Sequence, residues 1–174
     1  LLEVLSQSSL ENDCYPFLSS HEIDLGHARV RATRITYVGE LGWELMVPTE
    51  FATYVYERLM AVGREFGVKP AGYYAINAMR LEKAYRAFGT DLTPDHTPVE
   101  AGLTFACKLK TDIPFLGRAA VERSIHAGPR RTMVSLVLDD PQVMPWGGEL
   151  VLRDGRAVGQ VTSVTDPTGV VVVT

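Results

Sequence analysis

Residues 34–45 read Arg-Ile-Thr-Tyr-Val-Gly-Glu-Leu-Gly-Trp-Glu-Leu, and this stretch carries the densest chemistry in the 174-residue sequence. Residues 34–38 are β-branched, aromatic or alternating, as a half-buried strand requires, and residues 43–47 are typical of a second short strand. Gly39 and Gly42 lie between them and permit positive φ at either end of a tight connection. The stretch therefore predicts a hairpin that gathers four chemically useful side chains in a small volume: Tyr37, Glu40, Trp43 and Glu44.

These four side chains have two interpretations. Aromatic residues on a strand usually belong to the core, and glutamates beside a turn are usually solvated. The same groups can also bind a flat, nitrogen-rich ring such as a pterin or a purine. One carboxylate accepts two N–H donors from the edge of such a ring while aromatic side chains cover its faces. Residue types and spacing do not separate the two interpretations.

The stretch resembles the signature of the aminomethyltransferase family, the tetrahydrofolate-binding module of the glycine cleavage T-protein. This module also forms the C-terminal half of dimethylglycine and sarcosine dehydrogenases. The resemblance continues in order through Arg-Leu-Glu-Lys-Ala-Tyr-Arg at 80–86, Thr-Pro-Val-Glu-Ala-Gly-Leu at 97–103, Lys-Leu at 108–109 and Phe-Leu-Gly-Arg at 115–118. The first and last of these motifs are more similar to the dehydrogenase branch than to the free T-protein.

The resemblance implies a set of tetrahydrofolate contacts. Glu44 would hold the amide–guanidine edge of the pterin, and Tyr37 would stack on the ring or hydrogen-bond to it. Trp43 and Phe88 would form apolar walls. Ile76 stands where the T-protein has an arginine that helps to hold the folate, so this contact is in question. The presumed catalytic aspartate of the family would precede residue 1, and no catalytic residue is assigned within this chain.

The resemblance also implies the reaction. A flavin domain with bound FAD, upstream in the same protein, would oxidise an N-methyl group of dimethylglycine or sarcosine, and the bound folate would capture the carbon as methylenetetrahydrofolate. A stand-alone glycine cleavage T-protein is the nearest alternative. A non-catalytic relative, similar to the regulatory subunit of pyruvate dehydrogenase phosphatase, is the alternative from another class. Both ends of the sequence look cut, and such a fragment is expected to bind folate weakly or not at all, without turnover.

Two further motifs have open roles. The alternating charges at 80–86 favour either a surface segment with ion pairs or an extended lining of the folate cleft. Glu100 either caps backbone groups at a turn or lines the same cleft. The small residues that follow Glu100 favour the capping role.

Composition restricts the function classes. The net charge of −4, with no run of lysine and arginine, argues against nucleic acid as a partner. No apolar run reaches the roughly 18–20 residues that span a bilayer, so we expect no membrane association. Asp91, Asp95 and His96 lack a third ligand at a recognised spacing, so no metal is expected. The widely separated Cys14 and Cys107 favour a reducing compartment, either bacterial cytoplasm or mitochondrial matrix.

The expected fold class is α+β. Apolar residues at helical spacing predict a helix from Phe51 to Phe66, and residues 104–109 resemble a strand. From residue 131 onward, short strands alternate with turns, including an Asp-Gly hairpin at 154–155, and the sequence ends in an apolar strand at 169–174. The element Gly-Gln-Val-Thr-Ser at 159–163 resembles part of the family's C-terminal barrel. We therefore expect a folate-binding α/β domain at 1–128 and the start of a small β-barrel at 129–174.

Overall fold

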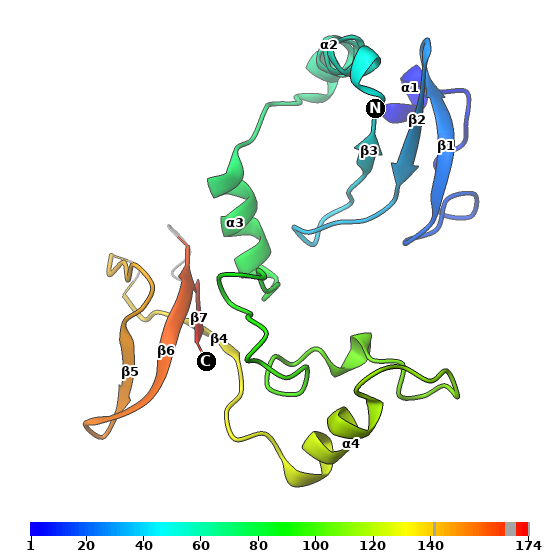
Figure 1. Ribbon diagram of the computed structural model, residues 1–174. Helices are drawn as coiled ribbons and strands as arrows, with labels where there is room; N and C mark the ends of the chain where they lie inside the picture. The colour runs from blue at the N-terminus through cyan, green and yellow to red at the C-terminus, as the bar shows by residue number, and fades with distance from the viewer. Residues whose placement is uncertain (141, 166–169, 174) are drawn as a thin grey trace. The chain divides into compact units, whose positions relative to one another are not determined.

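The computed structural model describes residues 1–140, 142–165 and 170–173, and the chain forms two compact units, Leu1–Ile76 and Asn77–Thr174. Helices and sheets occur together, as the α+β prediction requires (Figure 1). In the described ranges, no helix is long and apolar enough to cross a membrane. The boundary expected between residues 128 and 129 remains a prediction.

The first unit contains an antiparallel sheet in the order β1-β2-β3 and two helices (Figure 1). The strands are β1 (Ser20–Leu25), β2 (Ala28–Thr33) and β3 (Glu44–Met46). Short helix α1 (Leu2–Leu5) precedes the sheet, and α2 (Ala52–Gly63) follows it between the 3-10 turns η1 (Thr49–Phe51) and η2 (Arg64–Phe66). Gly67, with φ 69°, ends the helical segment at the predicted residue.

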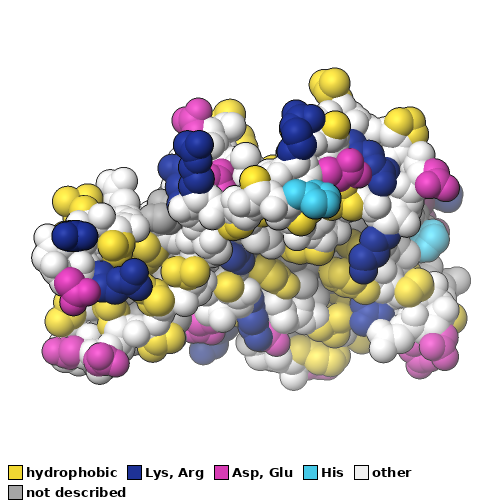
Figure 2. Space-filling view, turned by 90° about the horizontal axis from the view of Figure 1, so that it is seen from below, with side chains coloured by type: hydrophobic (Ala, Val, Ile, Leu, Met, Phe, Trp, Pro, Cys, Tyr) yellow, Lys and Arg dark blue, Asp and Glu magenta, His cyan; other side chains and the backbone are white. Residues whose placement is uncertain are grey.

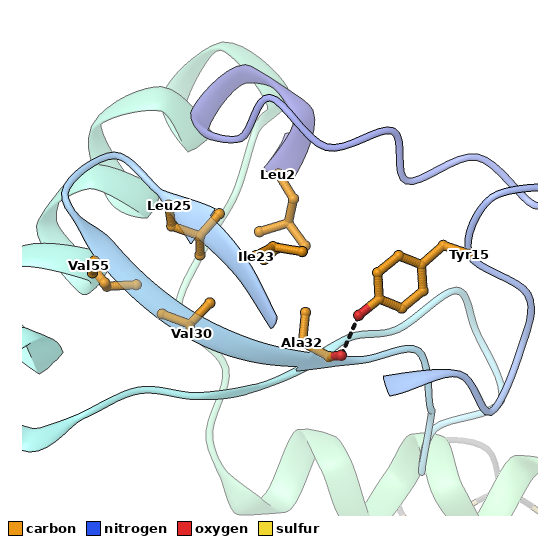
Figure 3. Close-up of a cluster of buried hydrophobic side chains, with 8 residues drawn as sticks. Leu2, Tyr15, Ile23, Leu25, Val30, Ala32 and Val55 are labelled. Carbon is orange, nitrogen blue, oxygen red and sulfur yellow. Dashed lines mark hydrogen bonds between the residues drawn. The ribbon is translucent and has the colours of Figure 1, made fainter. Parts of the chain in front are cut away.

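Period-2 alternation on β1 and β2 builds the core of this unit. Alternate side chains point to one face and pack against α1 and α2, where Figure 3 shows Leu2, Ile23, Leu25, Val30, Ala32 and Val55 gathered with Tyr15. The opposite face is polar, and there Glu22 pairs with Arg29 at 3.1 Å and with Arg31 at 3.3 Å. Burying each large aliphatic side chain stabilises the unit by about 1.5–3 kcal/mol.

The predicted strand at 34–38 is wrong. Strand β2 ends at Thr33, which pairs with Glu44, so residues 34–43 form a ten-residue loop between β2 and β3. The backbone of Arg34 explains the end of the strand, because its N–H donates to Ser19 O at 3.0 Å and its carbonyl accepts from Leu18 N at 2.9 Å. The hairpin exists, but its connection is longer than the four residues expected.

The second unit contains a four-stranded antiparallel sheet in the order β4-β7-β6-β5, with helices and turns before it in sequence (Figure 1). Helix α3 (Tyr73–Glu82) begins in the first unit, and η3 (Thr104–Ala106) and α4 (Arg118–Ala127) follow it. The strands are β4 (Val134–Val137), β5 (Leu150–Arg153), β6 (Arg156–Val164) and β7 (Val170–Val173). The hairpin at Asp154 and Gly155 is confirmed, with φ of 54° and 73°.

One strand prediction in this unit is wrong, and another is confirmed. Residues 104–109 form a 3-10 turn and an irregular segment instead of a strand. The apolar strand predicted at the end of the sequence is confirmed over Val170–Val173 as β7, which hydrogen-bonds to β4 on one side and to β6 on the other. Gly169 and Thr174 of that prediction lie outside the described residues. Because β7 lies between β4 and β6 in the sheet, Val171, Val172 and Val173 are buried.

Candidate functional site

The loop at 34–43 is closed tightly at its base. A Cβ on Gly42 would lie 2.7 Å from the backbone oxygen of Ile35, so a side chain at this position would collide with the other side of the loop. Gly39 has φ 73°, which confirms the positive φ expected there. Gly42 is not in the left-handed region, so the reason for its glycine is close approach. Inside the loop, Thr36 Oγ1 accepts a hydrogen bond from Val38 N at 3.2 Å.

Both ends of the loop, Arg34 and Trp43, contact Tyr15. The Trp43 ring lies edge-on to the Tyr15 ring, with centroids 4.6 Å apart and an interplanar angle of 75°. The Arg34 guanidinium lies over the Trp43 ring at 5.8 Å from its centroid and donates from Nη1 to Tyr15 O at 2.7 Å. These contacts fix Arg34 and Trp43 through packing, cation–π attraction and a charged hydrogen bond.

The adjacent residues Trp43 and Glu44 lie on opposite sides of the sheet. Trp43 and Leu45 pack against the core cluster, whereas Glu44 is exposed on the polar face. The Glu44 carboxylate has no hydrogen-bond or ion-pair partner among the residues that the structure describes. Tyr37 is 47% exposed on the loop. The loop and the start of β3 therefore present a phenol and a carboxylate to solvent, and the indole holds the base of the loop.

A hollow of about 510 Å³ lies on the inner side of the loop. Arg34, Leu41 and Trp43 contribute to its wall from the loop. Its remaining lining comes from the first eleven residues: Leu1, Leu2, Glu3, Leu10 and Glu11. Glu3 already accepts a hydrogen bond from Leu10 N at 3.0 Å. The hollow thus combines an apolar wall with charges of both signs.

Phe88, the fourth predicted contact, belongs to the second unit, whereas Tyr37, Trp43 and Glu44 belong to the first. Its ring is 76% exposed, and its backbone forms a bridge with Leu92. Phe88 lines a separate hollow of about 250 Å³ together with His96 and Cys107. Ile76, at the position of the arginine expected from the family, is half-buried on α3.

A buried polar network in the second unit escaped the sequence analysis. Arg80 is 2% exposed, and its Nη1 contacts Asp91 Oδ2 at 2.5 Å. The same guanidinium donates to Tyr85 O and Ser163 Oγ, each at 2.9 Å, and to Asn77 Oδ1. The expectation of a charged surface segment at 80–86 is wrong for Arg80. Alternating charge signs do not reveal which residue turns inward.

Asp91 accepts two further hydrogen bonds. Its Oδ2 accepts from Ala87 N at 2.9 Å, and its Oδ1 accepts from the Thr162 hydroxyl at 2.6 Å. Burial alone would raise the pKa of Asp91. The Ser163 and Thr162 hydroxyls, the Ala87 N–H and the Arg80 charge outweigh burial and hold the pKa below its ordinary value. The Thr-Ser pair within 159–163, noted for its resemblance to the family barrel, therefore stabilises a buried carboxylate.

Glu100 caps a turn, as the favoured interpretation predicted. Its Oε2 accepts from both Thr97 N and Thr97 Oγ1 at 3.0 Å, and its Oε1 lies 3.4 Å from Arg131 Nε. The Thr97 N–H, more than any other partner, lowers the pKa of Glu100.

Neither the charge pattern on one face nor the possible metal ligands among the described residues indicate a second site. On the face seen in Figure 2, lysine and arginine side chains are interspersed with acidic ones and do not form one basic patch. Over the described ranges, no group of three or more His, Cys, Asp or Glu residues could hold a metal ion.

Two family models match the chain. The GCVT N-terminal domain matches residues 1–111, and the glycine cleavage T-protein C-terminal barrel domain matches residues 131–166. Mouse mitochondrial sarcosine dehydrogenase is 44% identical over 163 residues, which cover 92% of this chain and 17% of that protein. Mouse mitochondrial dimethylglycine dehydrogenase is 39% identical over 94% of this chain and 19% of its own length.

A solved structure is similar along almost the whole chain. The crystal structure of glycine cleavage system aminomethyltransferase T from Bartonella henselae matches with a TM-score of 0.79 and 29% identity. The match covers 94% of this chain and 45% of that one. The chain thus spans less than a fifth of the two dehydrogenases and less than half of the solved structure.

Proposed function

The chain belongs to the glycine cleavage T-protein family, and from that membership we propose that its first unit binds tetrahydrofolate through the loop at 34–43 and the start of β3. The observation that carries this proposal is the Glu44 carboxylate, which is exposed and has no partner within the described part of the chain. An unpaired carboxylate on a strand can accept two parallel N–H donors from one ligand. The amide–guanidine edge of a pterin offers such a pair of donors.

Tyr37 suits a flat ring, because it has a half-exposed aromatic face on the loop that leads to Glu44. Trp43 packs on the opposite side of the sheet from Glu44, in contact with Tyr15 and Arg34, and its role as an apolar wall remains a prediction from the family resemblance. Phe88 remains a prediction from the family resemblance.

The chain's own residues would orient the folate and shield it from water. Bound tetrahydrofolate supplies the nitrogen atoms that accept a one-carbon unit. Holding those nitrogens in one position lowers the entropic part of the barrier, and excluding water protects the reactive carbon. No catalytic residue is assigned within the chain, and FAD, with the oxidation of the N-methyl group, is proposed to lie outside it.

For the protein as a whole, we propose a dehydrogenase of dimethylglycine or sarcosine that passes the released carbon to this unit. The 44% and 39% identities with the two mitochondrial dehydrogenases support this branch. Its compartment would be the mitochondrial matrix or bacterial cytoplasm. A free aminomethyltransferase is the alternative, supported by the similarity to the Bartonella enzyme.

Calorimetric titration with 5-formyltetrahydrofolate, a stable reduced folate, tests the proposal. Glu44→Gln removes the negative charge and leaves the shape of the side chain, while Asp24→Asn makes the same change on the same polar sheet face, at the far end of β1. We expect Glu44→Gln to weaken binding by more than about tenfold, equivalent to about 1.4 kcal/mol. The Asp24→Asn variant should bind like the natural chain.

Two outcomes would count against the proposal. Equal affinity of the natural chain and the Glu44→Gln variant would remove Glu44 from the site. If neither this chain nor the full-length protein binds the folate when folded, tetrahydrofolate is removed from the function, and a non-catalytic relative such as a regulatory subunit is favoured.

A further inference from the structure

We infer that Tyr15 is a positioning residue for the loop at 34–43, and through it for Glu44. Tyr15 is distant in sequence from the motif, yet its ring, its hydroxyl and its backbone carbonyl each contact a different part of the structure around the loop. The consequence for ligand binding rests on the proposed function.

The Tyr15 hydroxyl connects the two strands that precede the loop. It accepts a hydrogen bond from His21 N on β1 at 2.9 Å and donates a short one to Ala32 O on β2, which Figure 3 shows as a dashed line. The side chain is only 3% exposed, so both interactions are shielded from water. The hydroxyl therefore fixes the ring against the sheet.

The fixed ring and carbonyl then hold both ends of the loop. The Tyr15 ring makes a T-shaped contact with Trp43, the residue immediately before Glu44. The Tyr15 carbonyl accepts a hydrogen bond from the Arg34 guanidinium, which lies over the ring of the same Trp43. Arg34 is the first residue of the loop and Trp43 is its last. If the Tyr15 ring is free to shift, the indole loses its contact with it, and the backbone at Trp43, directly before Glu44, is held less tightly.

The hydroxyl also explains a preference for tyrosine at this position. A phenylalanine would fill the same space, but it would leave His21 N and Ala32 O without their shared partner, and its ring would no longer be fixed in its contact with Trp43. Tyr54 provides a matched comparison in the same unit. Its hydroxyl accepts from His27 N at 3.2 Å at the β1–β2 turn, at the opposite end of β2 from the loop.

The test compares Tyr15→Phe with Tyr54→Phe in a Trp146→Phe background, in which Trp43 is the single tryptophan of the chain. Acrylamide quenching reports the exposure of Trp43 without any ligand, and calorimetry with 5-formyltetrahydrofolate reports the site. We expect Tyr15→Phe to increase quenching of Trp43 and to weaken binding by about tenfold, the effect of one lost hydrogen bond. Tyr54→Phe should change neither quantity, although both variants lower the melting temperature.

Each outcome decides the inference. Unchanged quenching of Trp43 in the folded Tyr15→Phe variant would overturn it, as would increased quenching with unchanged folate affinity. Equal effects of the two variants would reduce Tyr15 to a general structural role and would also overturn it. If neither this chain nor the full-length protein binds folate, the proposed function fails, and the quenching comparison alone decides whether Tyr15 positions the loop.

Discussion

The Arg80 guanidinium and the Asp91 carboxylate form an ion pair at 2.5 Å, with side chains that are 2% and 0% exposed. Such a pair is stable only when the remaining hydrogen-bonding positions are also satisfied. Here Ala87 N and the Thr162 hydroxyl bind the carboxylate, while Tyr85 O and Ser163 bind the guanidinium. The pair thereby joins α3, the turn after it and β6 within one unit.

Replacement of Asp91 by asparagine should destabilise the second unit by about 3–5 kcal/mol, because Arg80 would remain buried without its counter-charge. Urea unfolding followed by circular dichroism at pH 7 measures this loss. Asp95→Asn is the control, since Asp95 is exposed four residues away. Similar unfolding free energies for the two variants would show that the ion pair contributes no more than a surface carboxylate.

The free energy of unfolding should depend on pH through the ionisation of Asp91. Its pKa in the folded chain is lowered, so the ionised group stabilises the fold above its ordinary pKa, and this contribution is lost as the pH falls through the lowered value. The difference in unfolding free energy between the natural chain and Asp91→Asn should therefore be largest near neutral pH and should decrease below about pH 4. A difference that stays constant down to about pH 2.5 would contradict the assignment.

Thr162→Val should cost about 1.5–3 kcal/mol, because it removes a hydroxyl that donates to a buried charged group. Its effect should nearly vanish when Asp91 is already asparagine, and a double-mutant cycle of unfolding free energies measures this coupling. Thr49→Val, at an exposed position, controls for the change of side chain alone. Additive effects of Thr162→Val and Asp91→Asn would mean that the two residues do not interact.

A local sequence signal predicted the β5–β6 hairpin. Asp154 with Gly155 specifies its turn, where both residues have positive φ. The decisive interactions lie within a few residues of one another, so the sequence pattern contains them.

The strand predicted at 34–38 failed for a tertiary reason. Its residue types suit a pleated surface, but β-propensity mainly reflects packing against neighbouring strands. Arg34 instead pairs through its backbone with Leu18 and Ser19, and the loop closes where Gly42 meets Ile35. The same limit applies to Arg80 and Asp91, because the hydroxyls that bind them come from residues 162 and 163.

The candidate site was partly accessible from the sequence. The motif located the loop and its carboxylate, but it did not reveal that Trp43 and Glu44 lie on opposite sides of the sheet. Nor did it point to Tyr15, which is 19 residues from Arg34. A one-residue difference in strand register reverses the side of every side chain, and this register is defined by the pairing of β2 with β3, in which Thr33 lies opposite Glu44.

Gly42→Ala should destabilise the first unit by about 1–3 kcal/mol, because the added Cβ would lie 2.7 Å from Ile35 O and force the loop base apart. Gly72→Ala is the matched control, since nothing lies within 4 Å of a Cβ there. Thermal unfolding of both variants measures the difference. Equal melting temperatures of Gly42→Ala and Gly72→Ala would mean that the base of the loop accommodates the added methyl group without loss of stability.

The most direct measurement is a binding cycle between Glu44 and the pterin edge. The natural chain and Glu44→Ala are each titrated with a reduced folate and with its analogue that lacks the 2-amino group. If Glu44 accepts the N–H donors of that edge, loss of the 2-amino group weakens binding to the natural chain by about tenfold and binding to Glu44→Ala by less than about twofold. An equal loss of affinity in both chains would contradict the placement of the pterin on Glu44.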